Sequence, residues 1–176
     1  LVVLGTTGET ATLSESEKYS IRQFVKEKVK GRLPLILGYG SNDTMSLVNK
    51  LKEDDLSGFD AILTVVPYYN KPSQEGIFQH YKAVAEASPI PVILYNVPGR
   101  TGVNMTAQTT LRIAREVPNV IGIKEASGNF IQIEEIIKNK PEYFQVISGD
   151  DASTYPLMTL GSSGVISVIG NAYPVE

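Results

Sequence analysis

A lysine interrupts an apolar, β-branched run in the second half of the chain. The run spans residues 120–126, and Lys124 is its only cation. A buried ammonium is costly unless it is paired or loses its proton, and a desolvated lysine shifts towards the neutral amine that attacks carbonyl carbons. Lys124 is therefore a candidate Schiff-base nucleophile. Taken alone, however, a lysine near a strand end more often extends its head group into water.

Tyr95 and Lys124 lie near the carboxyl ends of two successive predicted strands. Alternation of side chains along a strand puts Lys124 on one face with Val120 and Gly122, so that Gly122 leaves room below the lysine. A core tyrosine whose hydroxyl bonds to backbone is the ordinary alternative for Tyr95. Together the two residues predict that an amine and a phenol lie close together at the carboxyl ends of the strands.

Two loops add groups that suit a carboxylate. Thr6 and Thr7 lie between a predicted strand and a predicted helix and offer two hydroxyls and several backbone N–H groups, although a plain capping turn explains them equally well. Arg100 lies in a glycine-containing loop, where a guanidinium can bind a carboxylate in a bidentate manner, although such a charge is more often only solvated. The combination predicts a carboxylate-bearing substrate.

Composition removes several alternatives. The 176 residues include no cysteine and a single histidine, His80, so disulfides, thiolate metal sites, a histidine metal cluster and a Ser-His pair are excluded. Imine chemistry on Lys124 needs no metal or organic cofactor, and none is expected. The net charge of -3, with dispersed basic residues, does not predict binding to nucleic acid or to an anionic membrane. Without a long apolar run or a signal peptide, a soluble cytoplasmic protein that binds small molecules is predicted.

The candidate residues must be positioned by alternating strands and helices. Apolar runs and capping signals, among them the S-x-x-E box of Ser14 and Glu17, predict seven strands separated by six helices. The predicted strands are residues 1–5, 33–38, 61–66, 91–97, 120–126, 144–148 and 164–169. This alternation implies parallel strands joined by right-handed crossovers.

A (β/α)8 barrel and an open doubly wound sheet both fit this order. The segment 38–43 lacks the third glycine of a dinucleotide-binding turn, whereas polar and aromatic residues follow almost every strand, as in a barrel whose site is built from many loops. The prediction is an α/β fold, a TIM barrel present as a fragment with strands 2 to 8. The start within a strand and the stop without a helix after the last strand lead us to expect further chain at both ends.

Five segments resemble a known family in order and spacing: GTTGE at 5–9, PYYNKP at 67–72, YNVPGRTG at 95–102, GIKEA at 122–126 and SGDD at 148–151. They are similar to the dihydrodipicolinate synthases within the pyruvate-dependent class I aldolase family, which includes N-acetylneuraminate lyase. The resemblance covers residues 1 to about 171. It implies one domain over residues 1–176, a partial TIM barrel whose first strand and C-terminal helical region lie outside this sequence.

The resemblance also implies roles for individual residues. Lys124 matches the lysine that forms the Schiff base with pyruvate, and Tyr95 the tyrosine that relays protons, helped by Thr6 and by Tyr69 from a neighbouring subunit. The remaining matches concern substrate binding: Thr6 and Thr7 for the pyruvate carboxylate, Ile166 for a carbonyl facing the lysine, and Arg100 for the carboxylate of aspartate semialdehyde.

The implied activity is condensation of pyruvate with L-aspartate 4-semialdehyde in lysine (diaminopimelate) biosynthesis, by a lyase active as a homodimer or homotetramer. A sibling aldolase, acting on N-acetylneuraminate or a 2-keto-3-deoxy acid, remains an alternative, which the resemblance disfavours on the Thr6-Thr7 pair and on the Arg100-Thr101-Gly102 segment. A non-catalytic ligand-binding barrel is the alternative from another class. Lys18 and Ser46 depart from the pattern of lysine-inhibited members and imply weak feedback inhibition.

Overall fold

Seven parallel strands form one curled sheet in the computed structural model, which describes residues 1–174. Their order in the sheet is their order in the chain, β1-β2-β3-β4-β5-β6-β7. The strands are β1 (Val2–Val3), β2 (Ile36–Gly38), β3 (Ala61–Val65), β4 (Val92–Asn96), β5 (Val120–Glu125), β6 (Gln145–Ser148) and β7 (Gly164–Val165). Sequential parallel order with a crossover helix between successive strands is the arrangement of a (β/α)8 barrel.

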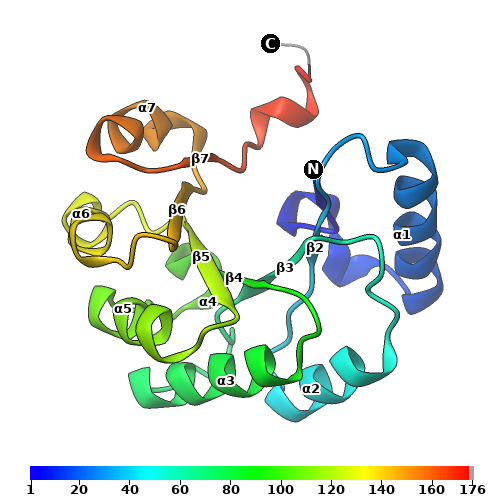
Figure 1. The fold of residues 1–176 in the computed structure, drawn as a ribbon, viewed down its shortest axis with the longest axis horizontal. Coiled ribbons are helices and arrows are strands. Elements are labelled where there is room, and N and C mark those ends of the chain that lie inside the picture. Colours follow the sequence, from blue (N-terminus) through cyan, green and yellow to red (C-terminus); the bar gives the residue numbers. More distant parts are fainter. Residues whose placement is uncertain (175–176) are drawn as a thin grey trace.

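Six helices connect the strands and lie around the outside of the curled sheet (Figure 1). They are α1 (Glu15–Val29), α2 (Thr44–Glu53), α3 (Gln74–Ala87), α5 (Ala107–Glu116), α6 (Phe130–Asn139) and α7 (Asp151–Leu160). Within residues 1–174, β1 and β7 pair with only one neighbour each and form the two edges of the sheet. The prediction of a partial TIM barrel with seven strands and six crossover helices is confirmed.

Local sequence explains where the helices begin. The Ser14 hydroxyl accepts from the N–H of Glu17, whose carboxylate accepts from the N–H of Ser14, so the predicted capping box is present. Each of the other five crossover helices also begins after a side chain that accepts from a backbone N–H of its first turn: Asp43, Ser73, Thr106, Asn129 and Asp150. Such caps satisfy N–H groups that have no partner within the helix.

Several elements differ from the prediction. Both edge strands are shorter than expected, with two residues each, and β2 has three residues in place of six. The predicted loop after β4 contains the helical turn α4 (Pro98–Thr101). Proline at its first position supports that turn, since its fixed φ suits a helix and its missing N–H is not needed there.

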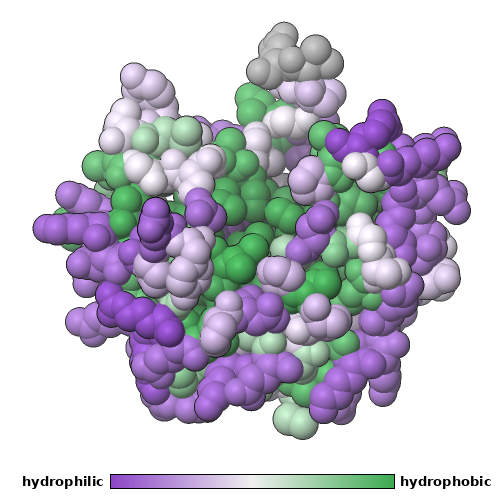
Figure 2. All heavy atoms as spheres, in the orientation of Figure 1, coloured by the Kyte–Doolittle hydropathy of each residue, from purple (hydrophilic) through white to green (hydrophobic). Residues whose placement is uncertain are grey.

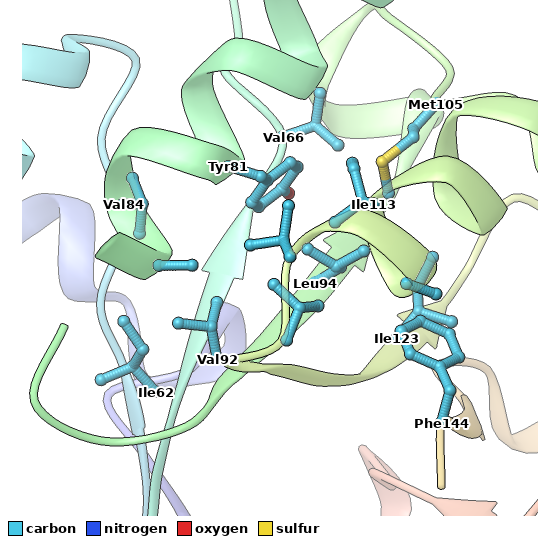
Figure 3. Packing of buried hydrophobic residues seen from close by; sticks show 14 of the residues in the cluster. Ile62, Val66, Tyr81, Val84, Val92, Leu94, Met105, Ile113, Ile123 and Phe144 are labelled. Atoms are coloured by element: carbon cyan, nitrogen blue, oxygen red, sulfur yellow. The ribbon is translucent and has the colours of Figure 1, made fainter. Parts of the chain in front are cut away.

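Apolar side chains pack on both faces of the sheet. The larger cluster fills the space between the sheet and the helices, where Leu94 and Ile123 of the sheet meet Tyr81 of α3 and Ile113 of α5 (Figure 3). A smaller cluster lies on the concave face: Ala61, Leu63, Ile93, Tyr95 and Val97. Burial on both faces explains why the strand sequences are apolar without strict alternation.

One irregularity corrects the predicted side-chain directions in β5. Val92 pairs with Val120, but the next residue, Ile93, pairs with Gly122, so Ile121 is an extra residue in the strand. Val120 consequently packs in the helix-side cluster, and Ile121 packs with Tyr95 on the concave face. The prediction that Val120 shares a face with Lys124 is therefore wrong, because a bulge reverses the alternation.

No helix within residues 1–174 is long and apolar enough to cross a membrane.

His80 predicts a pH dependence of stability. It is buried between α2 and α3, with Nδ1 2.8 Å from Thr44 Oγ1, and burial lowers its pKa to about 4 from 6.5. Because the unfolded chain takes up the proton more readily, the free energy of unfolding should fall by up to about 3 kcal/mol as the pH drops from 6.5 to about 4. Urea titrations at several pH values should show this slope, and it should be absent from His80→Gln.

Candidate active site

A cavity of about 700 Å³ opens at the carboxyl ends of the strands, where loops from many strands meet. Six of the seven predicted site residues line it: Thr6, Thr7, Tyr95, Arg100, Lys124 and Ile166. Figure 2 shows apolar residues gathered in the middle of the displayed face and hydrophilic residues around its periphery. The curled sheet thus brings together residues separated by up to 160 positions.

Lys124 lies at the end of β5 with 7% of its surface exposed. It is directly opposite Tyr95 in the register of β4 and β5, and its Nζ lies 4.5 Å from the centroid of the Tyr95 ring. Burial lowers the pKa of Lys124, and the positive charge of Arg100 lowers it further, whereas Asp151 opposes both effects. The amine is therefore held partly away from water, and this shifts its equilibrium towards the neutral form that attacks carbonyl carbons.

Two glycines control the space around this lysine. A methyl group on Gly149 would lie 3.0 Å from Lys124 Cε and 2.8 Å from the Cβ of Ala126, so the side chain of Lys124 packs directly against the backbone of residue 149. A methyl group on Gly122 would instead meet the backbone of Gln145 on β6, 2.6 Å from its carbonyl oxygen. Gly122 thus permits close approach of two strands, and Gly149 makes the room for the lysine.

Thr6 and Thr7 are exposed in a short 3-10 helix (Thr6–Gly8) that directly follows the turn out of β1. The hydroxyl of Thr10 donates to the carbonyl of Leu4 at 2.8 Å and stabilises this turn. Leu4 itself has a φ of 55°, which is unusual for a residue with a side chain. Both threonines therefore border the cavity from a fixed turn.

Two further predicted residues line the cavity, Arg100 before Lys124 in the chain and Ile166 after it. Arg100 belongs to α4, and its N–H donates to the carbonyl of Val97 at 2.9 Å. Ile166 follows β7, and its N–H donates to the carbonyl of Ser148 at 2.9 Å. A cation and a residue just after β7 therefore line the same cavity as the lysine.

Tyr69 is the predicted site residue that does not line the cavity. Its side chain is 87% exposed, its φ is 73°, and its N–H donates to the carbonyl of Thr101 at 3.2 Å. The neighbouring Asn70 amide donates to the carbonyl of Asn42 at 3.2 Å. The loop is thus secured by one backbone contact and one side-chain contact, while the aromatic ring extends outwards.

Two acidic residues near the lysine received no role in the predicted site. Asp151 accepts the N–H groups of Val168 and Ile169, at 2.9 and 3.1 Å, and so secures the segment that carries Ile166. Glu125 is buried on the opposite side of β5 from Lys124, with 1% of its surface exposed. Its position next to Lys124 in the sequence could have pointed to Glu125. Its hydrogen-bond partners, Asn96 and Gln132, come from other segments and could not be predicted from that position.

Comparison with known proteins agrees with this geometry. The model of the Dihydrodipicolinate synthetase family matches residues 1–176. A 4-hydroxy-tetrahydrodipicolinate synthase of Parabacteroides distasonis is 68% identical over the whole chain, which covers 59% of that protein. The chain thus spans about three-fifths of the length of its curated relatives.

Solved structures share the fold closely. Dihydrodipicolinate synthase from Thermotoga maritima superposes with a TM-score of 0.95 at 43% identity, over 99% of this chain and 60% of that one. The chloride-inhibited enzyme from Acinetobacter baumannii, solved in complex with pyruvate, gives 0.93 at 46% identity, over 98% and 59%. This chain therefore belongs to the dihydrodipicolinate synthetase family.

Proposed function

We propose that the protein containing this chain condenses pyruvate with L-aspartate 4-semialdehyde through a Schiff base on Lys124. The observation that carries the proposal is the placement of a nearly buried lysine over the Tyr95 ring, in a cavity that Thr6 and Thr7 also line. Family membership and the pyruvate complex of the Acinetobacter baumannii enzyme support it. A ligand-binding barrel without activity would have no need for this costly amine.

The proposed chemistry balances without a metal or an organic cofactor. The neutral amine of Lys124 adds to the keto carbon of pyruvate, and loss of water leaves an imine, which is protonated. The protonated imine draws electrons from the methyl carbon, so loss of one methyl proton gives an enamine. Its carbon attacks the aldehyde, the new alkoxide takes up a proton, and the substrate's own amine displaces Lys124 from the imine carbon.

Other residues bind and move protons in this scheme. Thr6 and Thr7 bind the pyruvate carboxylate through hydroxyl and backbone N–H groups at their exposed turn. The Tyr95 hydroxyl, with Thr6 and with Tyr69 of a second subunit, carries protons to and from the reacting carbons. Arg100 binds the carboxylate of the second substrate, and the Ile166 carbonyl faces the amine.

Trapping with borohydride tests the proposal. With pyruvate present, reduction of the full-length protein should add the mass of reduced pyruvate to the peptide that contains Lys124. Because only the neutral amine reacts and burial lowers the pKa of Lys124, the trapping rate should reach half of its maximum below pH 10.5, the ordinary lysine value. An adduct on another lysine, or no adduct, contradicts the mechanism.

The aldehyde partner separates this function from that of sibling aldolases. Arg100 beside the cavity favours an aldehyde with a carboxylate of its own over a longer, uncharged sugar chain. We expect the full-length protein to turn over aspartate semialdehyde and not to cleave N-acetylneuraminate. Arg100→Gln should raise KM for the semialdehyde while leaving KM for pyruvate nearly unchanged.

Tyr69 completes the site from a neighbouring subunit in this proposal, which makes the active unit a homodimer or homotetramer. Its exposed ring on a secured loop supports that role. Mixing Tyr69→Phe with Lys124→Ala should produce hybrid dimers in which one site keeps Lys124 and receives an intact Tyr69. Activity should rise on mixing, in proportion to the hybrids present. Two inactive variants that stay inactive after subunit exchange argue against shared sites.

Feedback inhibition by lysine should be weak. Lys18 and Tyr68 line one cavity, and a ligand ammonium there meets the charge of Lys18, although Glu15 accepts from Lys18 at 2.8 Å and partly neutralises it. Ser46 lacks the anion that lysine-inhibited members of the family have at that position. We expect little inhibition by submillimolar lysine, and more after Lys18→His with Ser46→Glu. Potent inhibition of the unmodified protein contradicts the charge argument.

The location in the cell and the domain organisation are also part of the proposal. Both substrates are small intracellular metabolites, so the enzyme is proposed to act in the cytoplasm. Residues 1–176 are proposed to form one domain, a part of the barrel.

A further inference from the structure

A buried polar cluster lies directly behind the candidate active site. It consists of four side chains on the helix side of the sheet: Asn96, Asn104, Glu125 and Gln132. Asn96 and Glu125 pair in the register of β4 and β5 immediately after Tyr95 and Lys124, and they are 0% and 1% exposed. Because side chains alternate along a strand, the chemical pair and the buried pair lie back to back.

The carboxylate of Glu125 is bound by neutral donors. Its Oε1 accepts the N–H of Ser127 at 2.8 Å, the amide nitrogen of Asn96 lies 3.2 Å from both carboxylate oxygens, and that of Gln132 lies 3.3 Å from Oε2. Within residues 1–174 it takes part in no ion pair. Burial raises the pKa of Glu125, and these donors counteract the rise. The desolvation of a buried carboxylate costs free energy, so its presence here suggests a function.

The other end of the cluster reaches two further segments. Asn96 Oδ1 accepts the N–H of Met105 at 3.0 Å, and Asn96 Nδ2 donates to Asn104 at 2.8 Å. Asn104 in turn donates to Gln132 of α6 at 2.8 Å. The carboxyl ends of two strands are therefore joined to each other, to α6 and to the segment before α5.

The backbone carries this constraint to the lysine. The N–H of Ala126 donates to the carbonyl of Asn96 at 2.9 Å, and the N–H of Gly149 donates to the carbonyl of Glu125 at 2.8 Å. Since the side chain of Lys124 packs against Gly149, a shift of residue 125 moves the amine relative to the Tyr95 ring. Displacements of about 1 Å at a reacting group are enough to cost about a hundredfold in rate.

We propose that Asn96 and Glu125 are positioning residues, which hold the ends of β4 and β5 together from behind so that Lys124 stays dry and aligned with Tyr95. The inference rests on the proposed function, in which Lys124 forms the imine. Neither residue touches the substrate. Their role resembles that of outer-shell groups that orient a ligand or a catalytic side chain through a second contact.

Exchange of donor and acceptor tests the pair. In Glu125→Gln, the N–H of Ser127 keeps the oxygen at the Oε1 position, so the new amide NH₂ takes the place of Oε2 and meets the NH₂ groups of Asn96 and Gln132. Asn96 keeps its contact with Oε1 but cannot turn over to accept from the new NH₂, because its oxygen accepts from Met105. In the double variant Glu125→Gln with Asn96→Asp, the hydrogen bond is restored in the opposite direction, because the amide at position 125 donates to the carboxylate at position 96. Asn104 and Gln132 can turn over together to follow this exchange, but Gln132 then loses the bond that its Nε2 donates to the carbonyl of Met105 at 3.1 Å, so the recovery should be partial.

Two measurements on the full-length protein are informative. We expect kcat of Glu125→Gln to fall by about tenfold or more with KM for pyruvate nearly unchanged, and the double variant to recover part of the loss. Without any substrate, acetylation of Lys124 by an acyl ester at neutral pH, relative to the exposed Lys52, should slow by about fivefold as water reaches the amine. The second measurement does not depend on the proposed reaction.

Asn119→Ala is the matched control, since its amide binds three carbonyls at the other end of β5, those of Ala85, Ser88 and Ile90. It should lower the melting temperature without slowing acetylation of Lys124. If Glu125→Gln behaves like this control, or if the double variant recovers nothing, the positioning role is overturned. If Glu125→Gln does not fold, Gln132→Met decides, and an unchanged acetylation rate there overturns the proposal.

These measurements also separate the two proposals. If the unmodified protein forms no imine with pyruvate, the proposed function fails, while the acetylation rates still decide whether the buried pair holds the lysine in place. If the imine forms and the variants leave its rate and the acetylation rate unchanged, the proposed function stands and the positioning role fails.

Discussion

Lys124→Ala is expected to lower kcat of the full-length protein by more than about a thousandfold, because removal of a covalent nucleophile leaves only binding and positioning. The borohydride adduct should disappear with the activity. The folded state should survive, since Lys124 is 7% exposed and its buried charge carries a desolvation cost that offsets part of the packing of its side chain. Steady-state kinetics and circular dichroism of the purified variant check both statements.

Two controls give this experiment its meaning. Lys124→Arg keeps a cation of similar length but cannot form the imine, so it should be as inactive as Lys124→Ala if covalent chemistry is required. Lys52→Ala removes an exposed lysine of α2 and should leave kcat unchanged. Substantial activity in Lys124→Arg would show that charge alone is sufficient and would refute the Schiff base.

Gly38→Ala is expected to cause the largest loss of stability among single methyl additions. The new methyl group would lie 2.0 Å from the carbonyl oxygen of Leu4 and 2.6 Å from its carbonyl carbon, and both are backbone atoms that must move. Overpacking of this kind costs about 1–3 kcal/mol or more in free energy of unfolding. Leu4 has little freedom to yield, since its φ is already 55° and its carbonyl accepts from Thr10.

The same substitution should also affect the site. Movement of Leu4 displaces the turn that carries Thr6 and Thr7, so KM for pyruvate should rise. The control is Gly99→Ala, because a methyl group there meets no atom within 4 Å and the stability should stay the same or increase slightly. Urea unfolding of both variants provides the comparison. Equal stability of Gly38→Ala and the unmodified protein would contradict the close approach of β1 and β2.

Local signals in the sequence determined most of the architecture. A capping box needs only Ser14 and Glu17, and the predicted start of α1 is correct because both partners lie within one turn. Apolar runs separated by helical segments likewise determined seven parallel strands in sequential order. The interruption by Lys124 identified a candidate nucleophile for the same reason, since an ammonium in an apolar run is anomalous in any fold.

Only the tertiary structure decided features that depend on partners far along the chain. The extra residue Ile121 arises from the pairing of β5 with β4, and it reversed the predicted direction of Val120. The exposed position of Tyr69 depends on a contact with Thr101, and the buried carboxylate of Glu125 depends on amides from β4 and α6. Periodicity and capping describe interactions within a few residues, whereas register, bulges and buried polar clusters are selected by the packing of whole elements against one another.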